Sequence, residues 1–214
     1  MADSKPDTRY VVLVDVVDSR EIPNRERFEE QLEDALGFVN QTESENVSTP
    51  FTQMKGIDEF GCVLRKLSPI PDIIPEVLNR IYPAYARFAV ASGEIDIGTG
   101  RETVAQMDGP AFHRASELLE SVEATDLYVD VKTNQKTDAL VANALNLLLL
   151  EREHLTSRQV ETILAYEKHG TQSKAGAELG LRQQAVSDTL HRANYKRRKK
   201  IRRSLRDTIE KLYD

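Results

Sequence analysis

The sequence has one cysteine and no tryptophan in 214 residues, and only 6% of its residues are aromatic. Because a disulfide needs two thiols, the lone Cys62 excludes a disulfide framework within the chain. No Cys/His cluster has metal-ligand spacing, so we expect no zinc site. We interpret Cys62 as a buried strand residue rather than a reactive thiol, in a protein of a reducing compartment.

Long apolar runs are also missing. The runs from Tyr10 to Val14 and from Leu147 to Leu150 are far shorter than the roughly 20 residues that cross a bilayer as a helix. The first residues, Met1 to Pro6, lack the apolar segment of a secretory signal peptide. We therefore expect a cytoplasmic protein with no membrane partner.

Charge is distributed unevenly along the chain. The whole sequence has a net charge of −6. Residues 151–214 hold 15 Lys and Arg against 9 Asp and Glu, a net +6, so residues 1–150, with 14 against 26, have a net −12. An acidic body with a basic tail is typical of a protein that meets a polyanion at one end, although a solvated charged helix gives the same count.

Apolar patterning predicts alternating strands and helices in the first part of the chain. The run from Tyr10 to Val17 is rich in β-branched residues without polar alternation, which is typical of a buried central strand. An amphipathic helix from Pro23 to Asn40 follows. The later predictions are strands at 48–55, 60–67, 87–97 and 127–131, a helix from Pro71 or Pro75 to Tyr82, and a helix after Gly109-Pro110. This β-α-β-β-α-β-α-β order predicts an α/β (α+β) fold, a ferredoxin-like sandwich.

We predict three parts in the chain. Residues 1–135 form the sandwich, residues 136–154 form a connector helix, and residues 155–214 form an all-α helix-turn-helix domain with a basic C-terminal helix. The apolar face expected for the connector consists of Leu140, Ala144, Leu147 and Leu148.

The segment 155–193 has the spacing of a helix-turn-helix. Gly176 is a small residue where two helices touch, Gly180 tolerates a left-handed turn, and Val186 is an apolar anchor. With the opening Leu155-Thr156-Ser157-Arg158-Gln159, in which Thr156 or Ser157 can cap a helix, the segment resembles the DNA-binding domains of LuxR-type regulators and the final region of sigma factors. The resemblance implies that the third helix enters the major groove of double-stranded DNA. A packing or dimerisation module is the alternative.

Two groups of side chains are predicted to contact DNA. Those expected to meet base edges are Arg182, Gln183, Gln184, Ser187 and His191. Those expected to neutralise phosphates are Lys196, Arg197, Arg198, Lys199 and Lys200. A solvated basic helix is the alternative. The same helix has an apolar stripe that packs on its own domain or forms a two-fold dimer contact, and its residues are Ile201, Leu205, Ile209 and Leu212.

Two acidic segments predict a cation site in the first part of the chain. Asp15 lies at the end of the first strand and Asp58 lies on a hairpin corner, so the two carboxylates converge if the strands are neighbours. Paired carboxylates repel each other unless a divalent cation lies between them, and two carboxylates with ligand phosphates are a usual Mg²⁺ or Mn²⁺ environment. The surrounding side chains predicted to bind phosphate or ligand are Asp18, Ser19, Arg20, Glu59 and His113. The alternative is that the aspartates only cap a strand and a turn.

Three motifs resemble the SatD family of bacterial proteins: Asp15-Val16-Val17-Asp18-Ser19-Arg20, Asp58-Glu59-Phe60-Gly61 and Asp108-Gly109-Pro110-Ala111-Phe112-His113. The resemblance covers most of residues 9–125. The same region is similar to class III nucleotidyl cyclases, which implies that Asp15 and Asp58 bind the metal. His113 and Glu117 stand where the cyclase helix has its transition-state Asn and Arg, and a carboxylate there would repel the charge that develops in cyclisation.

These patterns together predict a DNA-binding transcriptional regulator, expected to be a homodimer. Its cyclase-like domain is expected to sense a nucleotide or another phosphorylated ligand with a divalent metal, and no catalytic residue is assigned. The alternative is a metal-dependent nucleotidyl cyclase or nucleotidyltransferase. The paired aspartates argue for that enzyme and Glu117 argues against it.

Overall fold

The computed structural model describes residues 9–56, 58–98 and 103–214. Met1 to Pro6, for which we predicted no signal peptide, and Ile57 of the predicted hairpin corner lie outside these ranges. The strands are β1 (Arg9–Val16), β2 (Val47–Lys55), β3 (Glu59–Leu64), β4 (Ala86–Gly93) and β5 (Val129–Lys132). The α-helices are α1 (Arg25–Thr42), α2 (Ile70–Arg80), α3 (Pro110–Thr125), α4 (Asp138–Glu153), α5 (Ser157–His169), α6 (Gln172–Leu179), α7 (Gln183–Arg192) and α8 (Tyr195–Tyr213). Short 3₁₀ turns form η1 (Ser19–Glu21) and η2 (Val104–Gln106). The predicted mixed α/β fold is confirmed.

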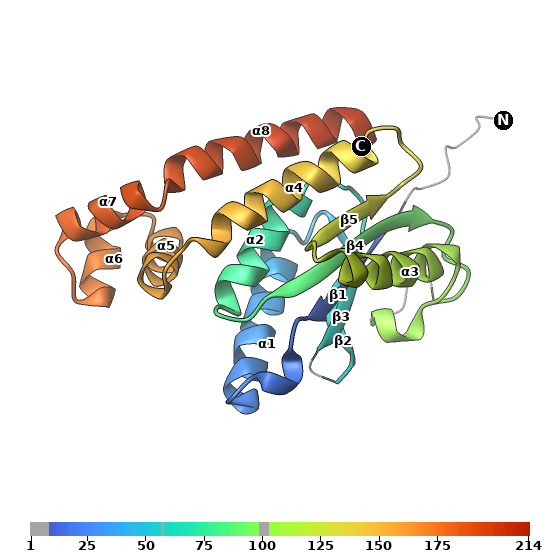
Figure 1. Ribbon diagram of the computed structural model, residues 1–214, viewed down its shortest axis with the longest axis horizontal. Coiled ribbons are helices and arrows are strands. Elements are labelled where there is room, and N and C mark those ends of the chain that lie inside the picture. The colour runs from blue at the N-terminus through green and yellow to red at the C-terminus, as the bar shows by residue number, and fades with distance from the viewer. Residues whose placement is uncertain (1–8, 57, 99–102) are drawn as a thin grey trace.

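The five strands form one sheet in the order β2-β3-β1-β4-β5 (Figure 1). β1 pairs antiparallel with both β3 and β4, β2 pairs antiparallel with β3, and β5 pairs parallel with β4. The prediction that the first strand lies at the centre of the sheet is therefore confirmed.

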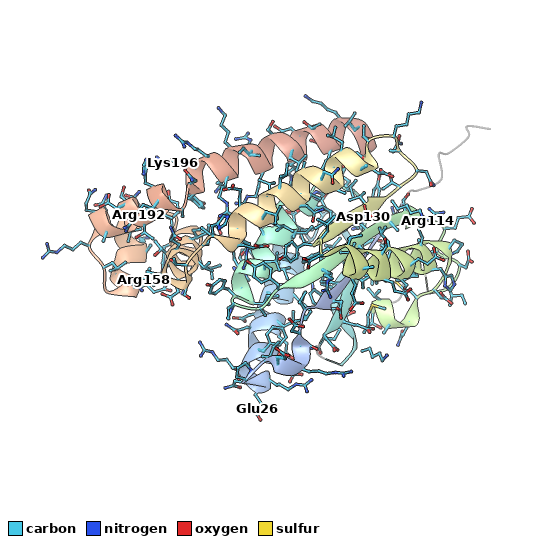
Figure 2. The ribbon with its side chains drawn as sticks, in the orientation of Figure 1. Glu26, Arg114, Asp130, Arg158, Arg192 and Lys196 are labelled. Carbon is cyan, nitrogen blue, oxygen red and sulfur yellow. The ribbon has the colours of Figure 1, made fainter. Side chains whose placement is uncertain are left out.

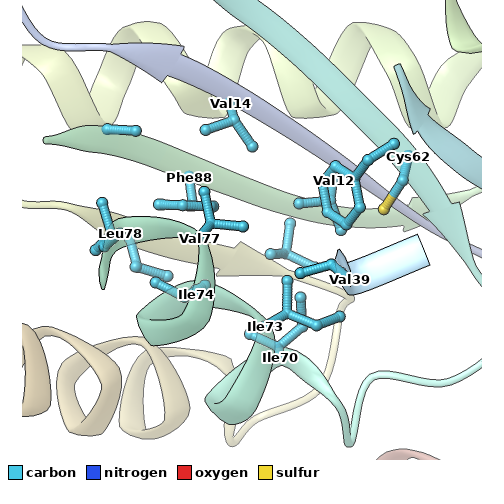
Figure 3. Packing of buried hydrophobic residues seen from close by; sticks show 14 of the residues in the cluster. Val12, Val14, Val39, Cys62, Ile70, Ile73, Ile74, Val77, Leu78 and Phe88 are labelled. Carbon is cyan, nitrogen blue, oxygen red and sulfur yellow. The ribbon is translucent and has the colours of Figure 1, made fainter. Parts of the chain in front are cut away.

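Both faces of β1 are buried, which explains its unbroken apolar run. Val12 and Val14 belong to the large core that α1 and α2 cover, which Figure 3 shows from close by. Val11 and Leu13 point to the other face and pack with α3 residues such as Ala115. A strand that is covered on both sides needs no polar alternation.

Helix α4 buries a different face from the one we predicted. Leu140 is 70% exposed and Leu147 is 65% exposed, whereas Val141, Leu145 and Leu149 join the large core. The helix carries leucines on both sides, so apolar periodicity alone did not identify the buried side. The helix predicted as a connector thus packs against β5 as part of the first core.

Helices α5, α6 and α7 surround a second, smaller core that includes Val160, Ala175 and Val186. Thr156 and Gln159 form a reciprocal capping box at the start of α5, so Thr156 is the cap. Gly180 ends α6 with φ 66°. A Cβ at Gly176 would lie 2.6 Å from the carbonyl oxygen of Leu181, so only glycine permits this close approach.

Helix α8 packs against α2 and joins the two cores. It spans the top of the view in Figure 1, above α4. Tyr195 at its start belongs to the second core, and Ile209 near its end is fully buried in the first. Arg206 Nη1 lies 3.1 Å from Glu43 Oε1 and 2.9 Å from Asp72 Oδ2. The predicted apolar stripe is therefore covered only in part, since Ile201 is 54% exposed. The part that is covered, at Ile209, packs on the first core.

Within residues 9–56, 58–98 and 103–214, no helix combines the length and the apolar character that crossing a membrane requires.

Candidate functional site

The pairing of β1 with β3 brings the segments of Asp15 and Asp58 together. Asp15 lies one residue before the end of β1 and pairs with Glu59, the first residue of β3. The backbone N–H of Val16 donates to the carbonyl oxygen of Asp58 at 2.9 Å. The Ser19 hydroxyl donates to Asp58 Oδ2 at 3.0 Å. Two loops that are distant in sequence thus meet at one end of the central strands.

The proximity of Asp58 affects the pKa of Asp15. Burial raises the pKa of Asp15 above its ordinary value of 3.8, and the nearby charge of Asp58 raises it further. Arg87 opposes both effects, with Nη1 3.9 Å from Asp15 Oδ2. A cation between two carboxylates relieves such repulsion.

A cavity of about 420 Å³ opens beside Asp15, on the face of the sheet that α3 covers. Its lining includes the carboxylates of Asp15, Glu59, Glu120 and Glu123. Arg87 Nη1 lies 3.8 Å from Glu123 Oε1, so this cation is shared between carboxylates. Such a lining repels a free anion, and it suits a cation or an anion that arrives with a cation.

The residues predicted to bind ligand around the pair lie in different places. Ser19 is buried against Asp58, and Glu59 lines the cavity. Asp18 and Arg20 are exposed on η1, directly after β1, and Asp18 has φ 52°, which aspartate tolerates better than most residues.

His113 does not lie at this site, which corrects the prediction. It is exposed in the first turn of α3 and pairs with Asp108, with Nε2 3.3 Å from Oδ1. That turn packs on Gly93, which pairs with Arg9 at the far end of β1. Asp15 is six residue steps along the strand from Arg9, a distance of roughly 20 Å. Glu117 is exposed along the same helix.

The side chains that could hold a metal are the carboxylates of Asp15 and Asp58, with the Ser19 hydroxyl beside them. In the described part of the chain, no group of three or more His, Cys, Asp or Glu side chains is arranged to hold a metal ion. Mg²⁺ and Mn²⁺ accept two carboxylates when waters or ligand phosphates complete the shell. The residues fit a cation of this kind better than one that needs a complete protein cage.

A second group of predicted residues lies on α7, which packs on the small core rather than on the sheet. The inner side of α7 is buried through Val186 and Leu190. The predicted residues on its outer side are exposed, or half-buried in the case of Ser187, and they are Arg182, Gln183, Gln184, Ser187 and His191. Gln184 Nε2 donates to Asp188 Oδ1 at 2.8 Å, so Asp188 is held by its own helix.

The predicted phosphate-binding run lies in the first turns of α8, directly after α7. Arg192 and Lys196 lie at the corner between these helices, away from the sheet (Figure 2). Four residues of the run are exposed, and they are Lys196, Arg197, Lys199 and Lys200. Arg198 differs from them, because its guanidinium turns inward and its Nη1 is buried. We therefore remove Arg198 from the predicted DNA contacts.

Two residues of the acidic site carry roles that sequence reasoning did not assign. Arg87 neighbours Asp15 across the β1–β4 register, which no local pattern shows. Gly56 has φ 61°, and a Cβ there would lie 2.7 Å from Asp58 Oδ1. The Gly-x-Asp corner of the sequence was the available signal for Gly56, because glycine tolerates this conformation.

Comparison with protein families matches residues 10–205 to the SatD family, and the chain belongs to that family. A search of solved structures includes a match titled "Structure of a bacterial light-regulated adenylyl cyclase". It is 13% identical with a TM-score of 0.42, and it covers 58% of this chain and 74% of that chain. This similarity is too low to carry an argument about activity. The comparison with curated proteins found no match.

Proposed function

We propose that this SatD family protein is a DNA-binding regulator, with α6 and α7 acting as a helix-turn-helix. In this proposal, β1 to β4 with α1 and α2 form a ferredoxin-like, cyclase-type sandwich. The sandwich binds a divalent cation together with a nucleotide or another phosphorylated ligand. The observation that carries the proposal is the exposed outer side of α7 beside the basic corner of α8.

The chemistry of that surface supports DNA binding. Gln183, Gln184 and His191 offer hydrogen-bond donors and acceptors that can read base edges in a major groove. Lys196 and Arg197 follow within two helical turns and can neutralise phosphates on the flanking backbone. Close packing at Gly176 brings α6 against the turn before α7 and against Val186, while the outer side of α7 stays exposed, as a recognition helix requires.

The acidic end supports the ligand part of the proposal. Asp15 and Asp58 are close enough for one charge to raise the pKa of the other carboxyl, which a divalent cation would reverse. Exposed Arg20 lies beside them on η1 and can pair with a phosphate oxygen. Phosphate would enter this acidic cavity only with the cation, so we expect ligand affinity to depend on Mg²⁺ or Mn²⁺.

Selection from a pool of random DNA duplexes tests the DNA part. We expect the wild type to enrich a common motif, and we expect Gln183→Ala/Gln184→Ala to change or weaken it, because amide contacts specify bases. Lys132→Ala/Lys136→Ala, which alters exposed charge elsewhere, should enrich the wild-type motif. A pool that stays random with the wild type would refute sequence-specific recognition.

Manganese titration tests the ligand part and separates it from the enzyme alternative. We expect Mn²⁺ binding, followed by electron paramagnetic resonance, to weaken at least tenfold in Asp58→Asn and to strengthen when a nucleoside triphosphate is added. The same mixtures are analysed for cyclic or oligomeric nucleotide products. If products form and Asp15→Ala abolishes them, the protein is a cyclase or nucleotidyltransferase rather than a sensor.

The proposal also includes a homodimer. Leu140 and Leu147 of α4 and Ile201 of α8 are large apolar side chains that are exposed in the single chain. A second copy would remove them from water. Light scattering of the purified protein measures the oligomeric state, and a monomer at all concentrations would contradict this part.

A further inference from the structure

Three arginines gather where α8 crosses from the small core to the large one. Arg152 near the end of α4 is 1% exposed, although arginine is rarely buried without a charged partner. Its Nε donates to Asn79 Oδ1 at 3.2 Å, and its Nη2 donates to the carbonyl oxygen of Leu78. Arg198 and Arg202 lie one turn apart on α8, and the side chain of Arg202 is 14% exposed. This arginine cluster consists of Arg152, Arg198 and Arg202.

Each member of the arginine cluster keeps a buried N–H group without a hydrogen-bond partner in the part of the chain that the structure describes. These atoms are Arg152 Nη1, Arg198 Nη1 and Arg202 Nε. A buried donor that has lost water and gained no acceptor is unfavourable. Glu167 beside Arg202 has one buried acceptor atom without a partner, Oε2. Three unpartnered donors exceed this single acceptor, which indicates that a further acceptor belongs there.

Positive charge exceeds negative charge in the same place. Glu167 is a partly buried carboxylate beside the cluster. Its Oε1 lies 3.6 Å from Arg202 Nη2 and accepts from the Tyr195 hydroxyl at 3.2 Å. Burial, followed by the charges of Arg202 and Arg152, lowers the pKa of Arg198 to about 10. The exposed Glu151 only partly offsets this effect. Glu167 therefore offsets the charge of Arg202, whereas Arg198 lies near the positive charges of both Arg202 and Arg152.

A cavity of about 20 Å³ lies against two of these arginines. Arg198 and Arg202 line it together with Asn79 and Tyr195, and apolar side chains of α2, α4 and α5 complete the wall. This volume holds one water-sized particle. It is too small for a nucleotide, and the charge around it favours an anion over water.

We propose that this cavity binds one monatomic inorganic anion of the size of chloride, held by Arg198 Nη1 and Arg202 Nε. The anion supplies the acceptor that the unpartnered donors lack, and it lowers the repulsion between neighbouring guanidinium groups. Because the cavity wall comes from α2, α4, α5 and α8, the anion joins the small core to the large one. The proposal does not depend on DNA binding.

Thermal unfolding at constant ionic strength tests this site, with sodium chloride compared with sodium gluconate, whose anion is too large for the cavity. We expect the wild type to have a higher Tm in chloride than in gluconate. This difference in Tm should be about 3 °C larger for the wild type than for Arg198→Gln. Arg197→Gln, which removes an exposed charge of the same helix, should keep the wild-type difference. Equal salt responses in the wild type and Arg198→Gln would overturn the proposal.

Bromide replaces chloride as a heavier probe in crystals of the wild-type protein, so this measurement stands even if Arg198→Gln does not fold. We expect an anomalous bromide peak between Arg198 Nη1 and Arg202 Nε. A cavity that holds only water, or a bromide peak only elsewhere, would overturn the proposal.

Discussion

At the scale of single residues, the acidic site depends on a glycine as well as on its carboxylates. Gly56 combines φ 61° with a Cβ position 2.7 Å from Asp58 Oδ1. We expect Gly56→Ala to lower the free energy of unfolding by about 1–2 kcal/mol and to displace the Asp58 carboxylate. Gly37→Ala is the matched control, because Gly37 is exposed in α1 with nothing within 4 Å of its Cβ position and should gain about 0.5–1 kcal/mol. Urea unfolding measures both, and equal effects would contradict the assigned role of Gly56.

Asp15 gives a pH-dependent prediction. Its pKa is raised from 3.8 in the folded protein, so the folded state holds the proton more tightly than the unfolded chain. Stability therefore falls as pH rises from the ordinary pKa through the raised one, and the loss persists above it. Asp15→Asn cannot ionise, so we expect it to unfold at higher urea than the wild type near neutral pH. This advantage should shrink as the pH approaches about 4, and an advantage that is independent of pH would contradict the assigned charge repulsion.

Sequence reasoning could place some of these residues but not others. The Asp58 corner lies directly before β3, so pairing of β3 with β1 was enough to bring it to Asp15. Arg87 reaches Asp15 only through the register of β4, which residue types do not encode locally. His113 was assigned from a motif resemblance, and the length of β1 places it at the other end of the sheet. Which strands are neighbours was therefore predictable, and the register of the more distant pairing was not.

At the scale of elements, α4 shows how a polar residue can be more important to packing than a leucine. Asn146 is buried, and its Oδ1 accepts from the backbone N–H groups of Tyr128 and Val129 at 2.9 and 3.1 Å. Its Nδ2 donates to the carbonyl oxygens of Val129 and Ala142 at 2.8 and 2.9 Å. These bonds attach the helix to the start of β5, and leucine periodicity gave no sign of them.

We expect Asn146→Ala to lower the free energy of unfolding by about 2–4 kcal/mol, because it leaves buried backbone groups of β5 unsatisfied. Its neighbour provides the control. Leu147→Ala, measured at a dilution at which the protein is monomeric, should change stability by less than about 0.5 kcal/mol, because Leu147 is largely exposed in the single chain. Denaturant unfolding of the two variants measures both, and a larger loss in Leu147→Ala would mean that α4 packs through the leucine face.

At the scale of the whole molecule, α8 packs on both cores, so we expect the two cores to unfold together. Its first turn packs with α7, and its far end contributes Ile209 to the large core. The backbone N–H groups of Leu67 and Ser68 donate to the Asp214 carboxylate at 2.8 and 3.1 Å, which fixes the end of the helix. Charge and periodicity in the sequence favour separate domains. They do not show which part of α8 packs on which core.

We expect Ile209→Ala to destabilise the whole chain by about 3 kcal/mol, because it leaves a cavity at a fully buried position. The wild type should unfold in one transition by both circular dichroism and tyrosine fluorescence. Ile201→Ala on the exposed part of the same helix, measured at a dilution at which the protein is monomeric, should cost less than about 0.5 kcal/mol. Two separate transitions in the wild type would show that α8 does not couple the cores.

The central claim is that the corner between α7 and α8 binds duplex DNA, and its most direct test is the salt dependence of binding to a fluorescent duplex. Lys196→Ala/Arg197→Ala should weaken binding and lower the slope of log Kd against log salt by about 2, or roughly 0.9 for each lost phosphate contact. Lys132→Ala/Lys136→Ala removes the same charge from an exposed surface near β5 and should bind like the wild type. Equal slopes and affinities for the two double variants would contradict the claim.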